Sequence, residues 1–80
     1  MNLWRRALHI ETQKIDDDEA DRASRSWSPL RIEQLKRRMD RALAGGARPI
    51  VRGEPDYPLA WNRLRSPPVG AWFKGKWRQN

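Results

Sequence analysis

The pattern of hydrophobic and polar positions predicts its clearest element over residues 29–44. Ser28 can cap the start of a helix, proline occupies the first helical position, and Gly45-Gly46 can end it. The apolar residues fall within a stripe about 100° wide at helical spacing; they are Ile32, Leu35, Met39, Ala42 and Leu43. The opposite side carries Arg31, Arg37, Arg38 and Arg41. The sequence therefore predicts an amphipathic helix with one apolar and one basic face.

Residues 3–15 fit two patterns. One helical face would hold Leu3, Trp4, Ala7, Leu8 and Ile15, with Asn2 as the N-cap. Alternatively, Trp4, Leu8 and Ile10 would alternate with their neighbours as in a strand. We favour the helix, in which His9 would be solvated or half-buried and would not act as a ligand.

An acidic cluster runs from Asp16 to Asp21. Adjacent aspartates raise the question of Mg²⁺, which prefers oxygen ligands. Consecutive positions point in different directions, however, and the chain has no second carboxylate cluster to complete a site. We therefore predict a solvated linker, or an acidic patch that offsets the basic half. Residues 1–28 would then form a helix or strand plus this linker, ahead of a basic unit over residues 29–80.

The pattern after the glycines predicts strands. A β-branched run indicates a short strand over residues 49–52, followed by a turn with two prolines at residues 54–58. Helical spacing of Leu59, Trp61 and Leu64 indicates one to two turns, which Ser66-Pro67-Pro68 ends. An aromatic strand is predicted over residues 69–77. The fold class is α+β: a small single domain with the main helix packed on a short two- or three-stranded sheet.

Composition excludes several classes of site. The 80 residues contain no cysteine and one histidine, which excludes disulfides, thiolate chemistry and a zinc knuckle. No Ser/His/Asp, Cys/His or paired-carboxylate arrangement stands at catalytic spacing, so we expect no enzyme and no cofactor. No apolar run approaches membrane-spanning length and no signal peptide is visible. We expect a cytoplasmic protein that does not bind membranes.

The positive charge is unevenly distributed. The net charge is +7, with nine Lys/Arg against eight Asp/Glu in residues 1–40 and eight against two in residues 41–80. Arginine outnumbers lysine by 13 to 4. Such a field favours polyanions, most often nucleic acid, and arginine suits bidentate phosphate contacts and base stacking. A GC-rich source would also raise the arginine count without any function, and this alternative stays open.

The second half carries a series of motifs in a defined order: Glu54 to Tyr57, Pro58, Trp61, Arg65 to Pro68, Ala71 to Phe73, and Lys74-Gly75. With the preceding helix and strand, residues 35–76 resemble the start of the Rossmann-like domain of the DNA-processing protein A (DprA/Smf) family. The resemblance implies a related local fold and a role in DNA processing. A compact phage or mobile-element derivative would be one origin for such a unit.

The chain departs from the family pattern in two ways. Trp61 or Ala60 stands where a leucine is expected. The chain also has no Gly-Ser-Arg phosphate-binding loop, because Gly45-Gly46 follows a helix and does not precede one. The DNA pocket and the dimer surface of the family therefore do not carry over to this chain.

Two functions remain open at this stage. The first is a small nucleic-acid-binding accessory protein without strong sequence preference, with single-stranded DNA favoured. The second is a protein-interaction module or inhibitor that binds an acidic host protein through a basic surface rich in tryptophan and arginine. The predicted contact residues are Arg37, Arg38, Arg41, Arg63, Arg65, Lys74, Lys76, Trp77 and Arg78.

The chain has five tryptophans, which is many for its length. We expect most of them to pack in the core, since an aromatic side chain buries a large apolar area. Trp61 and Trp72 are predicted core residues. Trp77 lies between Lys76 and Arg78 and is predicted to stack on a base.

Overall fold

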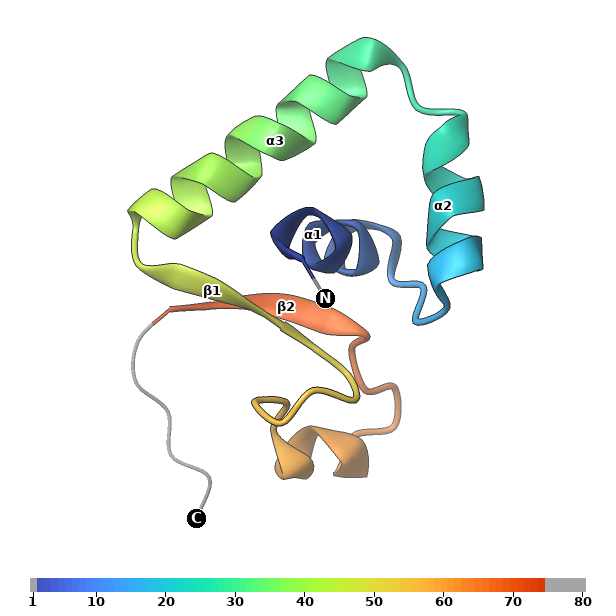
Figure 1. Ribbon diagram of the computed structural model, residues 1–80. Coiled ribbons are helices and arrows are strands. Elements are labelled where there is room, and N and C mark those ends of the chain that lie inside the picture. The colour runs from blue at the N-terminus through green and yellow to red at the C-terminus, as the bar shows by residue number, and fades with distance from the viewer. Residues whose placement is uncertain (1, 75–80) are drawn as a thin grey trace.

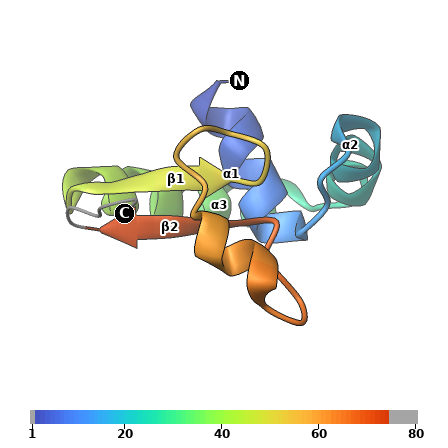
Figure 2. The ribbon, with the colours of Figure 1, turned by 90° about the horizontal axis from the view of Figure 1, so that it is seen from below.

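The computed structural model describes residues 2–74, which form three α-helices, a 3₁₀ helix and a two-stranded antiparallel sheet (Figures 1 and 2). In chain order these elements are α1 (Leu3–Thr12), α2 (Asp17–Arg25), α3 (Pro29–Ala44), β1 (Ala47–Val51), η1 (Leu59–Arg63) and β2 (Gly70–Lys74). The predicted α+β class is confirmed. None of the helices in this range is long and apolar enough to cross a membrane.

Helix α1 lies across the sheet and contacts both strands, with α3 on its other side (Figure 1). The Asn2 side chain caps the helix by accepting a hydrogen bond from the Arg5 backbone N–H at 2.7 Å. Ala7 and Leu8 are buried. The helix favoured for this segment is therefore confirmed, and it ends before Ile15, which is exposed.

Helix α3 has the bounds that its capping signals predicted. The Ser28 hydroxyl accepts a hydrogen bond from the Arg31 backbone N–H at 3.2 Å, and Pro29 occupies the first turn. Gly46 then takes a positive φ of 86°, which turns the chain into β1. Leu35 is 2% exposed and anchors the inner face, whereas Leu43 is 37% exposed at the edge of the apolar stripe. The packing of α3 thus depends on its middle more than on its last turn.

The sheet pairs β1 with β2, with Pro49 opposite Trp72 and Val51 opposite Gly70. The predicted strands are confirmed with shifted bounds, and residues 75–77 lie outside the described residues. A Cβ atom at Gly70 would lie 2.8 Å from the Ile50 carbonyl oxygen and 2.9 Å from Ile10 Cγ1. Only glycine therefore allows α1 to pack this closely on β2.

The connection between the strands is held by Tyr57, which is buried. Its hydroxyl donates a hydrogen bond to the Pro68 carbonyl oxygen at 2.7 Å, and its ring meets the Trp61 ring edge to face, with centroids 5.3 Å apart. Trp61 and Trp72 are half-buried, so their assignment to the core was too strong. Both rings cover the core from its edge.

The acidic segment forms helix α2, so the predicted linker is wrong. The Asp16 carboxylate caps the helix by accepting hydrogen bonds from the backbone N–H groups of Asp18 and Glu19 at 2.8 and 3.1 Å. Further carboxylates lie in the first turn and two arginines in the last turn, the placement that a helix dipole favours. Ala20 is fully buried and faces the rest of the fold. A run of acidic residues can therefore begin a helix, because its first carboxylate can cap the backbone N–H groups of the residues that follow.

Candidate nucleic-acid interface

A basic surface lies along one side of α3. Gln34, Arg37, Arg38 and Arg41 line a shallow, open hollow on this helix. They fall at positions i, i+3, i+4 and i+7, which share one face of an α-helix. Leu35 is buried against the core on another side of the helix, and the same rotation leaves these four residues exposed. We call these four residues the α3 basic face.

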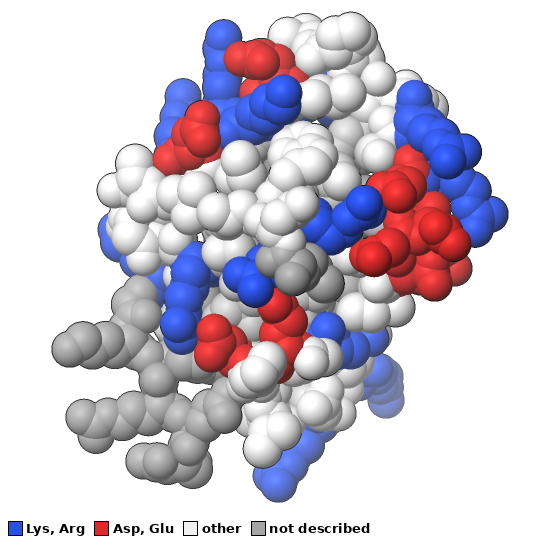
Figure 3. Space-filling model, in the orientation of Figure 1, with Lys and Arg blue, Asp and Glu red and all other residues white. Residues whose placement is uncertain are grey.

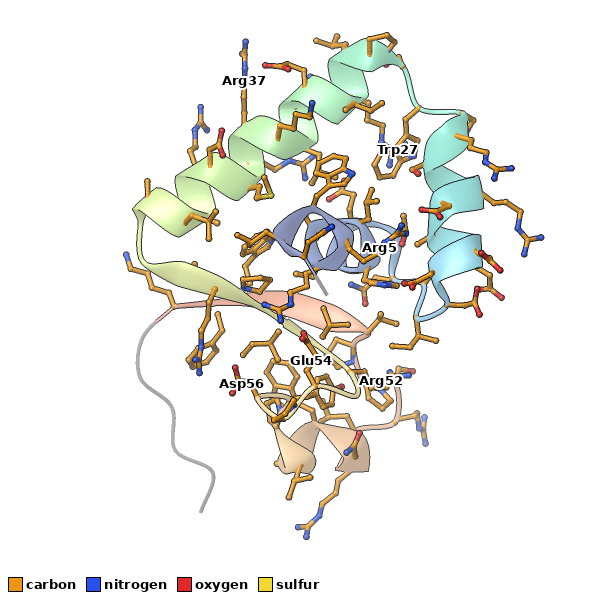
Figure 4. All side chains as sticks on the ribbon, in the orientation of Figure 1. Arg5, Trp27, Arg37, Arg52, Glu54 and Asp56 are labelled. Atoms are coloured by element: carbon orange, nitrogen blue, oxygen red, sulfur yellow. The ribbon has the colours of Figure 1, made fainter. Side chains whose placement is uncertain are left out.

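The three arginines of the α3 basic face differ in the contacts that they make within the protein. Arg37 forms a 3.5 Å ion pair with Glu33, and its side chain is 73% exposed and points away from the fold (Figure 4). Arg38 reaches both carboxylate oxygens of Glu11 on α1, at 3.3 and 3.4 Å. Arg41 is exposed in the last turn of α3. Exposed pairs of this kind are weak, so Arg37 and Arg41 can turn to a ligand while Arg38 partly serves to hold α1.

The other predicted contact residues do not all join this face. Lys74 is exposed at the end of β2, opposite Ala47, and therefore lies at the corner where α3 ends. Arg63 in η1 and Arg65 just after it are exposed on the far side of the sheet from α3 (Figures 1 and 2). Lys76, Trp77 and Arg78 lie outside the described residues. The single contact surface predicted from sequence is thus divided between the two ends of the molecule.

Two tryptophan rings near α3, those of Trp4 and Trp27, contact basic side chains of this helix. The Arg31 guanidinium lies 4.3 Å above the centroid of the Trp27 ring. The Lys36 ammonium lies 5.9 Å from the centroid of the Trp4 ring. Both rings are half-buried, and in Figure 4 Trp27 points into the angle between α2 and α3. These cation–π contacts tie α3 to the rest of the fold, and neither ring lines the hollow of the α3 basic face.

The acidic cluster is engaged in structural contacts. His9 is fully buried, which corrects the expectation that it is solvated or half-buried. Its Nδ1 lies 2.5 Å from the Lys14 carbonyl oxygen and its Nε2 lies 2.8 Å from Asp17 Oδ1. Asp21 pairs with Arg5 at 2.5 Å, and this hydrogen bond raises the pKa of Arg5. No group of three or more metal-ligating side chains occurs within residues 2–74. Asp17 and Asp21 thus connect α2 to α1.

Several residues that position the sheet gave no clear signal in the sequence. Gln13 has a left-handed φ of 55°, and its side-chain amide accepts from the Val69 backbone N–H at 3.0 Å and donates to the Gly70 carbonyl at 3.2 Å. Arg52 donates to the Pro67 carbonyl oxygen, and Arg6 pairs with Glu54 at 2.7 Å. These contacts join segments that are far apart in the chain, so no local sequence pattern predicts them.

Charge is unevenly spread over the surface (Figure 3). Acidic side chains gather over the start of α2, on the right of the view, whereas basic and acidic side chains lie side by side along α3. Glu33 and Asp40 lie one turn before and one turn after Arg37 on the same helix, and Glu33 forms an ion pair with it. A polyanion that approaches the row at Arg37 therefore meets these carboxylates beside the arginines.

No model of a known protein family matches the chain, and neither does any curated protein or any solved structure. The resemblance to the DprA/Smf family stays a prediction from the motifs of residues 35–76. Within that range, the contact between Tyr57 and Pro68 shows that the Tyr-Pro and Pro-Pro motifs meet in one folded unit.

Proposed function

We propose that this protein is a small basic nucleic-acid-binding accessory protein that acts by binding, without a catalytic step and without strong sequence preference. The observation that carries the proposal is the α3 basic face: three arginines and a glutamine around one open hollow. Guanidinium groups present paired N–H donors that match phosphate oxygens. A DNA-processing role of the kind seen in the DprA/Smf family is part of this proposal.

The charge distribution supports the same proposal. The net charge of the chain is +7, while three carboxylates of the acidic segment, those of Asp16, Asp17 and Asp21, already have partners within the fold. Arg41 lies in the last turn of α3, and Lys74 lies at the adjoining corner. A phosphate backbone that follows α3 would therefore meet basic side chains from its middle to its end.

The test is binding of labelled oligonucleotides, measured by fluorescence anisotropy over a range of salt concentrations. If six phosphates are neutralised, log K should fall against log salt with a slope of about −4 for single strands and about −5 for duplex DNA. Arg37→Glu/Arg41→Glu should weaken binding and flatten the slope, whereas Arg22→Glu/Arg25→Glu on α2 makes the same change of charge elsewhere. Absence of binding at low salt, or equal losses in both variants, would overturn the proposal.

A second candidate function, binding to an acidic host protein, rests on the far end of the molecule. Leu59 is 74% exposed and Leu64 is 53% exposed, beside the exposed Arg63 and Arg65. Apolar anchors surrounded by arginine suit a protein partner with an apolar, acidic surface. Affinity capture from a host lysate with wild type and with Leu59→Ser/Leu64→Ser tests it: one protein retained by wild type and lost from the variant supports this function.

A further inference from the structure

Helix α3 is open along its outer side. It runs along the edge of the molecule with no other element outside it (Figures 1 and 2). Its 16 residues make a rod about 24 Å long. An α-helix with its side chains is about 10–12 Å across, and the major groove of B-DNA is about 12 Å wide. The dimensions of α3 therefore suit that groove.

The α3 basic face has the chemistry of groove recognition. Arginine pairs with guanine O6 and N7, glutamine pairs with adenine N6 and N7, and arginine also binds phosphate. From Gln34 to Arg41 the row is about 10.5 Å long, which corresponds to about three base pairs. Leu30 is 67% exposed one turn before this row, and an apolar side chain there can contact a thymine methyl group.

Within residues 2–74, the α3 basic face lacks the exposed aromatic rings that single-strand binding requires. Unpaired bases are held by stacking on exposed aromatic rings. Trp4 and Trp27 are instead covered by Lys36 and Arg31, and the hollow is lined by Gln34 and the three arginines alone among the described residues. Because no aromatic ring of residues 2–74 lines the hollow beside the arginines, this surface suits bases that remain paired.

We infer that α3 binds duplex DNA by lying in its major groove, with Gln34, Arg37 and Arg41 directed toward base edges and phosphates. This inference rests on the proposed function and narrows it from nucleic acid in general to B-form duplex DNA. Double-stranded RNA is disfavoured because the major groove of an A-form helix is too deep and narrow for side chains to read. The few base-contacting side chains on one helix are consistent with weak sequence preference.

The first experiment compares three probes at one low salt concentration: a DNA duplex, one of its strands, and an RNA duplex of the same sequence. We expect the DNA duplex to bind at least about tenfold more tightly than the RNA duplex, since only the former admits the helix. Equal or tighter binding of either the single strand or the RNA duplex would overturn this inference and leave the proposed function intact. Failure of all three to bind would instead overturn the proposed function.

The second experiment locates the groove. Bound protein should protect guanine N7, which faces the major groove, from methylation by dimethyl sulfate. Distamycin, which occupies the minor groove of A/T-rich DNA, should leave binding unchanged. Unprotected N7 atoms together with displacement by distamycin would place the protein in the minor groove and overturn the inference.

The third experiment assigns the contact to α3. Arg37→Ala/Arg41→Ala should lower duplex affinity at least about tenfold and reduce the salt slope by about 2. Arg22→Ala/Arg25→Ala removes the same charge from α2, and Arg63→Ala/Arg65→Ala removes it from the η1 end; both should retain most of the affinity. All three pairs are exposed, and thermal unfolding of each variant verifies that it is folded. If the α3 pair behaves like the other two, α3 is not the helix in the groove.

Discussion

Helices α2 and α3 both combine acidic and basic residues, yet they use them in opposite ways. Three carboxylates of the acidic segment have partners within the fold: Asp16 caps α2, Asp17 contacts the buried His9, and Asp21 pairs with Arg5. The arginines of the α3 basic face surround an open hollow, and Arg37 has only an exposed partner. A cluster of like charges therefore indicates a binding surface only where the fold has not already supplied its partners.

The largest expected effect separates the inner face of α3 from its outer face. Leu35→Ala should lower the free energy of unfolding by about 2–5 kcal/mol, because Leu35 is 2% exposed and its loss leaves a cavity. Leu30→Ala, on the same helix but 67% exposed, should change it by less than about 0.5 kcal/mol. Urea unfolding followed by circular dichroism measures both. Equal effects would mean that α3 is not anchored through Leu35.

The next effect tests whether the charge of α2 is structural. Asp17→Ala should cost about 1–3 kcal/mol of folding free energy, because it leaves the buried Nε2 of His9 without its partner. Asp18→Ala removes the same charge from the same helical turn, where the carboxylate is exposed. The difference between the two variants isolates the contact with His9. If they unfold at the same urea concentration, the His9–Asp17 contact does not hold α2 in place.

A smaller effect is expected for the ion pair between Arg5 and Asp21. Their side chains are 30% and 39% exposed, so solvent screens them and the pair should contribute at most about 1 kcal/mol. A double-mutant cycle with Arg5→Ala and Asp21→Ala measures the coupling between the two residues. It should shrink in concentrated salt. A coupling that stays constant from low to high salt would show that the contact is not electrostatic.

The smallest effect on stability should come from the α3 basic face itself. Arg37→Glu/Arg41→Glu should leave the melting temperature nearly unchanged, since both side chains are exposed and few contacts of the fold depend on them. Adding Arg38→Glu should lower it further, because a glutamate there would face Glu11. Differential scanning calorimetry of the double and triple variants separates the two cases. A double variant that melts far below wild type would show that this face is part of the fold.

The elements that local signals define were predictable from the sequence. Ser28, Pro29 and the following glycines set the bounds of α3 because capping and termination act between near neighbours. The spacing of Leu35 and the arginines set which side of the helix would be buried, since helical periodicity is a local property. The glycine and proline positions likewise separated the two strands, although three of their four ends shifted by one or two residues and the predicted end of the second lies outside the described residues.

Only the tertiary structure decided what those elements do together. It joined α2 to α1 through the contacts of Asp17 with His9 and of Asp21 with Arg5, and it buried His9. It placed Arg63 and Arg65 at the opposite end from α3, although all of them belong to the same basic set in the sequence. Contacts of this kind join positions that are separated in the chain. Packing therefore decided which charged side chains have partners, which residues are buried and which lie close together. The amphipathic character of α3, by contrast, follows from its own sequence.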